Sequence, residues 1–463
     1  MRFVFHNPHG LIWYKIHYYY FANDLKCTPK CEYIFDYFYI DKKSKIYVYL
    51  DNYGWEVSPF VGRFEKFSSP LINFYIWVVI NRLNPFRFEV ITDINELKED
   101  DVLMTFLYEH FTSFAGSFKI SRESLIKGFK RTKAYKVVHL SHYGFYASLG
   151  SKNTFDAETD LFISENNLTR NSKFFQHYYH WYNKDVYVLP FVPQSRFIRT
   201  RKFKERKNKA VATGTITFAM ADNDFLSFFD SNQLHPMRLE IFNNSDRFKD
   251  CIDSLIYKYK IPDLSDQVVI AQQNIVSCES NSLINKLSLK MFKLIKRIAL
   301  KIFPELNLFK KQVTIFIKII FAFFREKTIQ NISNEMDYYK FDIVKLYNEY
   351  KMFIVPEEII DLPGIGFVEG MFCGSAFIGK KNQMYDDIGL IDKVNYISYD
   401  GTLSDLIDKI KYYQNHEEEL DAIAEAGYKF ATTSFTRQKV TEKFLSKLEC
   451  ELKSKRSILN DDG

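Results

Sequence analysis

Short, continuous apolar segments recur through the first half of the chain, and they constrain its fold more than any other feature. A strand that is apolar on both sides belongs in a sheet whose two faces are covered, which is typical of parallel strands. Because polar or helical stretches separate these segments, the pattern predicts a doubly wound α/β domain. The predicted strands cover residues 2–5, 45–50, 88–91, 102–106, 136–140, 160–163 and 185–189.

The pattern starts again in the second half, so the 463 residues divide into two α/β domains. Strands are predicted at residues 210–218, 351–355, 376–379 and 395–399, and helices at 403–415, 417–432 and 436–454. Thr402 and Ser404, followed by acids, are typical of a helix start. The predicted organisation is an N-terminal domain at 1–198, a basic linker at 199–208, a C-terminal domain at 209–445, and a helix end and tail at 446–463.

Residues 282–327 form a basic segment that interrupts this pattern. They contain eleven basic and two acidic residues, a net charge of +9 in a chain whose total is +6. Apolar and basic residues both recur every three or four positions before Pro304, which predicts an amphipathic helical insertion. Such a helix favours an anionic membrane surface, although its apolar face can instead pack on its own domain. No nucleic-acid-binding motif accompanies the charge.

The apolar run at residues 1–8 is too short for the apolar region of a signal peptide. No apolar run in the sequence reaches the ~18 residues that a membrane-spanning helix needs. We therefore expect a cytoplasmic protein that is soluble or peripheral on the inner face of the cell membrane. Of six cysteines, only Cys27 and Cys31 lie close together, without a second pair at zinc spacing. Free thiols and no metal site are predicted.

A glycine-containing segment runs from Asp361 to Gly374 with the sequence DLPGIGFVEGMFCG. It places two acids, Asp361 and Glu369, eight positions apart, and a helix start is expected after them. Backbone N–H groups at a helix start can receive a diphosphate, and carboxylates accept hydrogen bonds from sugar hydroxyls. The alternative is a structural loop, because acids are also favoured at helix N-termini.

This segment resembles the Glu-x7-Glu motif of GT-B glycosyltransferases, in particular the bacterial group 1, or family 4-like, enzymes of capsule, O-antigen and lipopolysaccharide synthesis. The resemblance covers residues 209–445, and Asp361 replaces the family's first Glu. It implies two Rossmann-like domains facing a cleft, with the basic insertion in the second domain and the last helix returning to the first. It also implies that Asp361 approaches the transferred sugar and Glu369 the ribose of a nucleotide-sugar donor.

Further donor-binding residues are expected in the second domain. Gly364 and Gly366 would let the backbone approach the donor, and Gly370 and Gly374 would open the following helix. The triplet Thr213, Gly214 and Thr215 would end the domain's first strand and offer N–H groups to a phosphate, or it is a simple turn. Arg238 would contact the diphosphate, or it is a surface residue.

Histidines gather at the predicted strand ends of the first domain, where an acceptor would bind. The acceptor-side candidates are His6, His9, Gly10, His110 and His139, and His142 is a candidate catalytic base. Each of these histidines can instead have a purely structural role.

The predicted reaction moves a sugar from a nucleotide-sugar to a polysaccharide or lipopolysaccharide acceptor, carried on a lipid, with retention, no cofactor and no metal. Glu369, Asp361 and His142 are the catalytic candidates, and an essential histidine base would favour inversion. Asp222 and Asp224 form an Asp-x-Asp pair that a metal-dependent GT-A enzyme would use, although a polar turn is the preferred explanation. A non-catalytic scaffold with a degenerate cleft is the alternative function.

Overall fold

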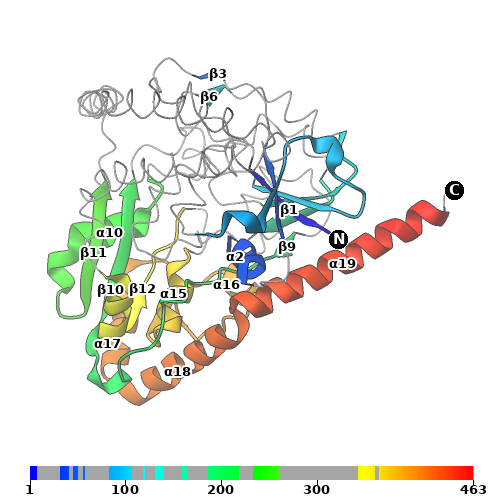
Figure 1. Cartoon of the computed structure of the whole chain (residues 1–463). Helices are drawn as coiled ribbons and strands as arrows, with labels where there is room; N and C mark the ends of the chain where they lie inside the picture. The colour runs from blue at the N-terminus through cyan, green and yellow to red at the C-terminus, as the bar shows by residue number, and fades with distance from the viewer. Residues whose placement is uncertain are drawn as a thin grey trace, which may run out of the picture.

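The computed structural model describes twelve stretches of the chain: residues 1–7, 32–40, 45–50, 56–57, 83–106, 118–119, 131–139, 159–164, 186–217, 233–259, 342–359 and 364–461. Within them, the chain forms a seven-stranded parallel sheet, a five-stranded parallel sheet and one short antiparallel pair, β3 (Glu56–Val57) with β6 (Phe118–Lys119) (Figure 1). The expected fold class of two doubly wound α/β units is confirmed. The basic segment 282–327 lies outside the described residues.

The first sheet has the strand order β4-β2-β1-β5-β7-β8-β9, and every neighbouring pair is parallel. The order extends in both directions from β1, as in a doubly wound sheet. Its strands are β1 (Phe3–Asn7), β2 (Ile46–Leu50), β4 (Phe88–Ile91), β5 (Val102–Phe106), β7 (Tyr135–His139), β8 (Leu161–Ser164) and β9 (Tyr187–Val188). Every strand predicted in the first half overlaps one of them.

The second sheet has the order β11-β10-β12-β13-β14, again parallel throughout. Its strands are β10 (Lys207–Thr217), β11 (Ile252–Tyr259), β12 (Tyr350–Ile354), β13 (Ala376–Lys380) and β14 (Ile397–Tyr399). Four of the five were predicted. The strand β11 was not predicted, because its residues IDSLIYKY are only partly apolar. Among the described strands, β11 pairs with β10 on a single side.

Helices cover both faces of the second sheet. One buried cluster joins the sheet to α10 (Pro236–Asn244) and α17 (Leu403–Gln414), and another joins it to α14 (Ile343–Glu349) and α15 (Gly366–Phe372). The remaining helices of the described residues are α2 (Glu32–Ile40), α16 (Gln383–Asp387), α18 (Glu417–Ser434), α19 (Arg437–Asp461) and the 3-10 turns η2 (Pro85–Arg87), η3 (Ile94–Glu96), η5 (Phe203–Glu205) and η6 (Ser245–Phe248).

The predicted start of α17 is confirmed, since the Thr402 side chain accepts a hydrogen bond from Asp405 N. No helix in the described part of the chain is long and apolar enough to cross a membrane.

Within the described residues, the chain crosses between the two cores twice. Leu189 belongs to the core of the first sheet, and Phe197 belongs to that of the second. At the other end, α19 leaves α18 and packs against the first sheet (Figure 1), where the Phe444 ring lies 6.3 Å from that of Phe3. Two ion pairs fix α19 there: Arg437 with Asp36 at 2.7 Å and Lys455 with Asp160 at 2.9 Å. The predicted tail at 446–463 therefore continues α19 as far as Asp461.

The predicted linker at 199–208 is anchored on the second unit. Arg206 is buried and donates hydrogen bonds to the carbonyls of Tyr347, Arg201 and Cys373, and burial lowers its pKa to about 10. Arg199 contacts Glu425 at 2.5 Å and lies 3.9 Å from the Tyr428 ring centre. The last residues of the basic stretch, from Lys207, already belong to β10.

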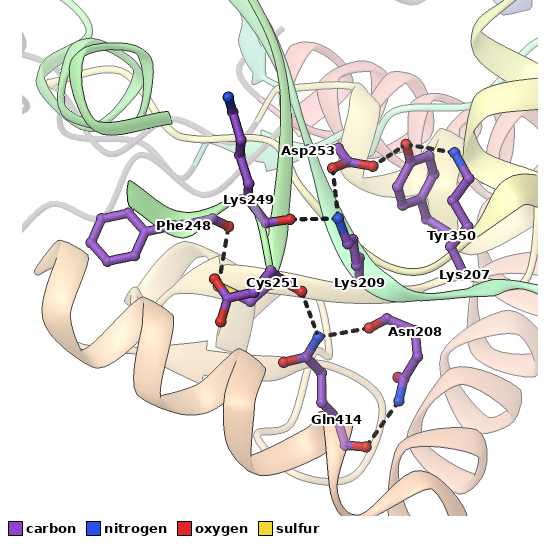
Figure 2. Close-up of polar contacts among 10 residues, drawn as sticks. Lys207, Asn208, Lys209, Phe248, Lys249, Cys251, Asp253, Tyr350 and Gln414 are labelled. Atoms are coloured by element: carbon purple, nitrogen blue, oxygen red, sulfur yellow. Dashed lines mark hydrogen bonds and ion pairs between the residues drawn. The ribbon is translucent and has the colours of Figure 1, made fainter. Parts of the chain in front are cut away.

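A polar network ties together the amino ends of β10, β11 and β12 (Figure 2). The Tyr350 hydroxyl donates to Asp253 at 2.6 Å and accepts from Lys207 Nζ at 3.1 Å. Lys209 Nζ lies 3.2 Å from the other Asp253 oxygen. Since Tyr350 is buried, desolvation and Asp253 together raise its pKa, and the hydroxyl keeps its proton as a donor.

Removing this hydroxyl by Tyr350→Phe should lower the free energy of unfolding by about 1–2 kcal/mol, because the partly buried Asp253 carboxylate loses a donor. Denaturant unfolding measures the loss. The matched control is Tyr412→Phe, which removes an exposed bond to Glu419 and should cost under about 0.5 kcal/mol. Equal losses in the two variants would show that the partly buried hydrogen bond to Asp253 contributes no more to the free energy of unfolding than the exposed one to Glu419.

Candidate functional site

Charged side chains gather at the carboxyl ends of β10, β12 and β13. In open α/β sheets, ligands bind outside the carboxyl ends of the strands. Here Gly214 lies near the end of β10, and Arg238 lies in the first turn of α10. Glu357 and Glu358 follow the end of β12 after two residues. Lys380 is the last residue of β13.

Arg238 joins the ends of two strands. Its Nε donates to the Pro356 carbonyl oxygen at 3.0 Å, just beyond β12, and its side chain passes over Gly214 on β10. Gly214 has a φ of +145°, in the region that favours glycine. Arg238 as a residue is half-buried, and the bond to Pro356 holds its Nε in place.

A histidine and a carboxylate pair beside Arg238. Both are buried, and His235 Nε2 lies 3.4 Å from Glu358 Oε1. The Ile359 N–H donates to the Leu234 carbonyl at 2.9 Å, which holds the two segments together. Burial first, and the Arg238 charge second, lower the pKa of His235, so the ring is neutral at pH 7 and its Nε2–H faces Glu358.

This pair predicts a specific acid sensitivity. The folded protein holds His235 below its ordinary pKa of 6.5, so the unfolded chain binds the proton more tightly, and stability is lost as the pH falls below 6.5. The His235→Gln variant should lose less stability than the wild type between pH 7 and pH 5, as measured by thermal unfolding. The exposed His416 supplies the control, and His416→Gln should follow the wild-type curve. Parallel curves for all three proteins would contradict the prediction.

Glu357 fixes the end of β13. Its Oε1 accepts from Lys380 N at 3.0 Å and from the Tyr385 hydroxyl at 2.6 Å. Burial, together with the Glu357 charge, raises the pKa of Tyr385 well above its ordinary value, so this hydroxyl remains a donor. Glu357 thus ties the last residue of β13 to Tyr385 of α16.

Glu369 lies within α15, which begins at Gly366. The expectation that the helix starts after Glu369, with Gly370 and Gly374 opening it, is therefore wrong. Glu369 keeps some exposed surface, but the surrounding protein raises the pKa of its carboxyl to about 7, and the charge of Arg196 opposes this only in part. The carboxyl consequently titrates near neutral pH.

The glycines of this segment serve packing. A side chain at Gly370 would overlap the Phe353 ring, with only 2.3 Å between its Cβ and Phe353 Cζ. At Gly366, the Cβ would lie 2.8 Å from a methyl group of Val355. Gly374 ends α15 with a φ of +74°, and its N–H donates to the Met371 carbonyl. These contacts bring α15 close to β12.

Several predicted residues lie elsewhere or outside the described part of the chain. Thr213, Gly214 and Thr215 lie within β10, which continues to Thr217, so the expectation that they end the strand is wrong. Thr213 is buried, with its hydroxyl 3.4 Å from that of Tyr347. In the first sheet, His6 belongs to β1, and His139 is buried at the end of β7. Outside the described residues lie Asp361, His9, Gly10, His110, His142, Asp222, Asp224, Cys27 and Cys31.

The contact between His235 and Glu358 was not predicted. His235 precedes Pro236 and Glu358 lies two residues after Pro356, but no local pattern indicates that these two segments meet. Over the stretches that the structure describes, no group of three or more His, Cys, Asp or Glu residues could hold a metal ion.

No family model matches the chain, and no curated protein matches it. Several solved structures are similar to it at low identity. HepE of Anabaena in complex with UDP is 11% identical, with a TM-score of 0.49, over 97% of this chain and 100% of HepE. A glycosyltransferase from Rickettsia africae is 9% identical, with a TM-score of 0.44, over 98% and 99%.

The pneumococcal O-GlcNAc transferase GtfA, in complex with UDP and GlcNAc, is 12% identical, with a TM-score of 0.38, over 77% of this chain and 58% of GtfA. With TM-scores below 0.5, these similarities decide neither a fold, nor an activity, nor a ligand. The fold assignment accordingly depends on the two parallel sheets themselves.

Proposed function

We propose that the protein is a glycosyltransferase that moves a sugar from a nucleotide-sugar donor to a glycan acceptor. The observation that carries the proposal is Arg238, which lies across the carboxyl ends of β10 and β12 and is held there by the Pro356 carbonyl. A guanidinium at this edge suits a diphosphate, whose negative charge grows as the bond to the sugar breaks.

Glu369 and Asp361 take the roles that the family resemblance implies. Glu369, on α15, would accept hydrogen bonds from the ribose, and Asp361 from the transferred sugar. We propose retention, in which the leaving diphosphate is stabilised and no separate base is required. If His142 proves essential as a base, inversion replaces retention.

The acceptor and the location belong to the proposal as well. We propose a lipid-linked polysaccharide or lipopolysaccharide acceptor, as in capsule or O-antigen synthesis, reached from the inner face of the cell membrane through the basic segment 282–327. The support is the segment's net charge of +9, which suits an anionic lipid surface. The alternative is a non-catalytic scaffold with the same fold, which would bind no nucleotide.

The test is a panel of nucleotide-sugars, each assayed for release of the nucleoside diphosphate or monophosphate. The wild type should release nucleotide from one donor, and Arg238→Ala should reduce kcat/KM by about 100-fold through the lost charge at the leaving group. Arg247→Ala removes an exposed arginine of the same unit and should leave kcat/KM unchanged. Absence of both release and calorimetric binding for every donor would refute the transferase and favour the scaffold.

A further inference from the structure

Gly214 and Arg238 are in direct contact. A Cβ on Gly214 would lie 2.9 Å from Arg238 Nε, 3.0 Å from Cδ and 3.3 Å from Cζ. The Arg238 side chain therefore occupies the volume that any other residue at position 214 would fill. The two residues come from different elements, β10 and the first turn of α10.

The backbone of Gly214 belongs to the sheet. Gly214 is paired with Ile256 of β11, and β10 continues for three residues beyond it. Gly214 is thus part of a strand. Because it has no side chain, Arg238 can lie directly over its backbone. Its φ of +145° further restricts the position to glycine.

Contacts among the described residues and the packing of α10 hold the arginine in place. Gly214 lies beneath the side chain, the Pro356 carbonyl accepts from its Nε at 3.0 Å, and α10 is held to the sheet by its buried residues Met237 and Ile241. An arginine side chain carries about 2 kcal/mol of rotamer entropy when it is free. A guanidinium already fixed at the strand ends loses little of this entropy when it binds an anion.

We propose that Gly214 is a positioning residue for Arg238, and that it sets the affinity for the donor's diphosphate without touching the nucleotide. This inference rests on the proposed function, because it assumes that Arg238 meets the diphosphate. A side chain at position 214 would lift the guanidinium from its place on the strand ends. The nucleotide affinity should therefore fall only when Arg238 is present.

The binding experiment is a double-mutant cycle on the full chain. Wild type, Gly214→Ala, Arg238→Ala and the double variant are titrated by calorimetry with UDP, GDP, ADP, CDP and dTDP. Gly214→Ala and Arg238→Ala should each weaken binding of the best nucleotide by about 10- to 100-fold, and the double variant should be no weaker than Arg238→Ala. The control is Gly389→Ala, at another positive φ (+94°) beside Phe430, and it should leave the Kd unchanged.

A stability cycle tests the contact without any ligand. Gly214→Ala should lower the melting temperature more than Gly389→Ala does in the wild-type background. With Arg238 already replaced by alanine, the effect of Gly214→Ala should fall to that of Gly389→Ala, because the colliding side chain is gone. The same effect in both backgrounds would overturn the inference.

The outcomes distinguish a failure of the role of Gly214 from a failure of the proposed glycosyltransferase function. If Arg238→Ala weakens nucleotide binding and Gly214→Ala does not, the role of Gly214 is refuted and the proposed function stands. If Arg238→Ala leaves binding unchanged, Arg238 has no part in the diphosphate site, and the inference fails with it. If the wild type binds none of the nucleotides, both proposals are refuted.

Discussion

Replacing Glu369 by glutamine should stabilise the protein above pH 7 and strongly reduce the proposed sugar transfer. Burial raises the pKa of this carboxyl from 4.5 to about 7, so between these values the folded protein holds a proton that the unfolded chain releases. The stabilising effect of this proton is complete below pH 4.5 and lost as the pH rises through 7. Above pH 7, the folded protein carries a partly buried charge, which glutamine removes.

The expected gain at pH 8 is about 1–2 kcal/mol after allowance for the partly exposed side chain, and at pH 4 the two proteins should be equally stable. Thermal unfolding at both pH values measures it. If Glu369 binds the donor's ribose as proposed, transfer should fall by about 100-fold or more, because glutamine is a weaker acceptor than a carboxylate.

Glu425→Gln is the control of opposite sign. Its carboxylate contacts Arg199, which holds the pKa of Glu425 below its ordinary value, so glutamine there should destabilise the protein at pH 8. If Glu369→Gln gained no stability at pH 8, burial would not raise the pKa of the Glu369 carboxyl, and this prediction would be wrong. If its transfer rate matched the wild type, Glu369 would have no place in the donor site, whatever its stability.

A single methyl group at position 370 should be the most destabilising small change in the second unit. Alanine normally favours a helix over glycine by about 1 kcal/mol. Here the new Cβ would lie 2.3 Å from Phe353 Cζ, and that ring is enclosed by Tyr347 and Phe377, with ring centres 5.1 and 5.3 Å away. The overlap costs about 3 kcal/mol or more, so it outweighs the helix preference.

Denaturant unfolding of Gly370→Ala measures this loss. Adding Phe353→Leu should recover part of it, because the smaller side chain frees the space, whereas Phe353→Leu alone should destabilise the wild type. Gly364→Ala is the milder comparison, since within the described residues its Cβ would meet a Val355 methyl group at 3.2 Å. A Gly370→Ala protein as stable as the wild type would show that α15 can move away from β12.

The strands could be predicted because burial dictated their composition. Residues 135–139 of β7 are buried at every position. In a parallel strand covered on both faces, apolar residues follow one another and seldom alternate with polar ones. In contrast, β11 pairs with one described neighbour, mixes polar with apolar residues and gave no such signal.

The site was harder to predict because its contacts are not local. Arg238 and the acids after β12 were visible in the sequence, but the pairing of His235 with Glu358 depends on two segments that meet only in the folded sheet. The glycines around Glu369 suggested a loop from local preference alone. Their actual requirement is the close approach of α15 to β12, which tertiary packing imposes.

The return of α19 to the first sheet also bears on the order in which the protein can fold during synthesis. Residues 1–198 leave the ribosome first, yet their core includes Val440, Phe444, Leu448 and Leu452, which are made last. The second unit can therefore complete its core while the first still exposes the surface that α19 covers. A fragment that ends before α19 would carry this apolar surface permanently, so expression of the N-terminal domain alone should yield an aggregating product.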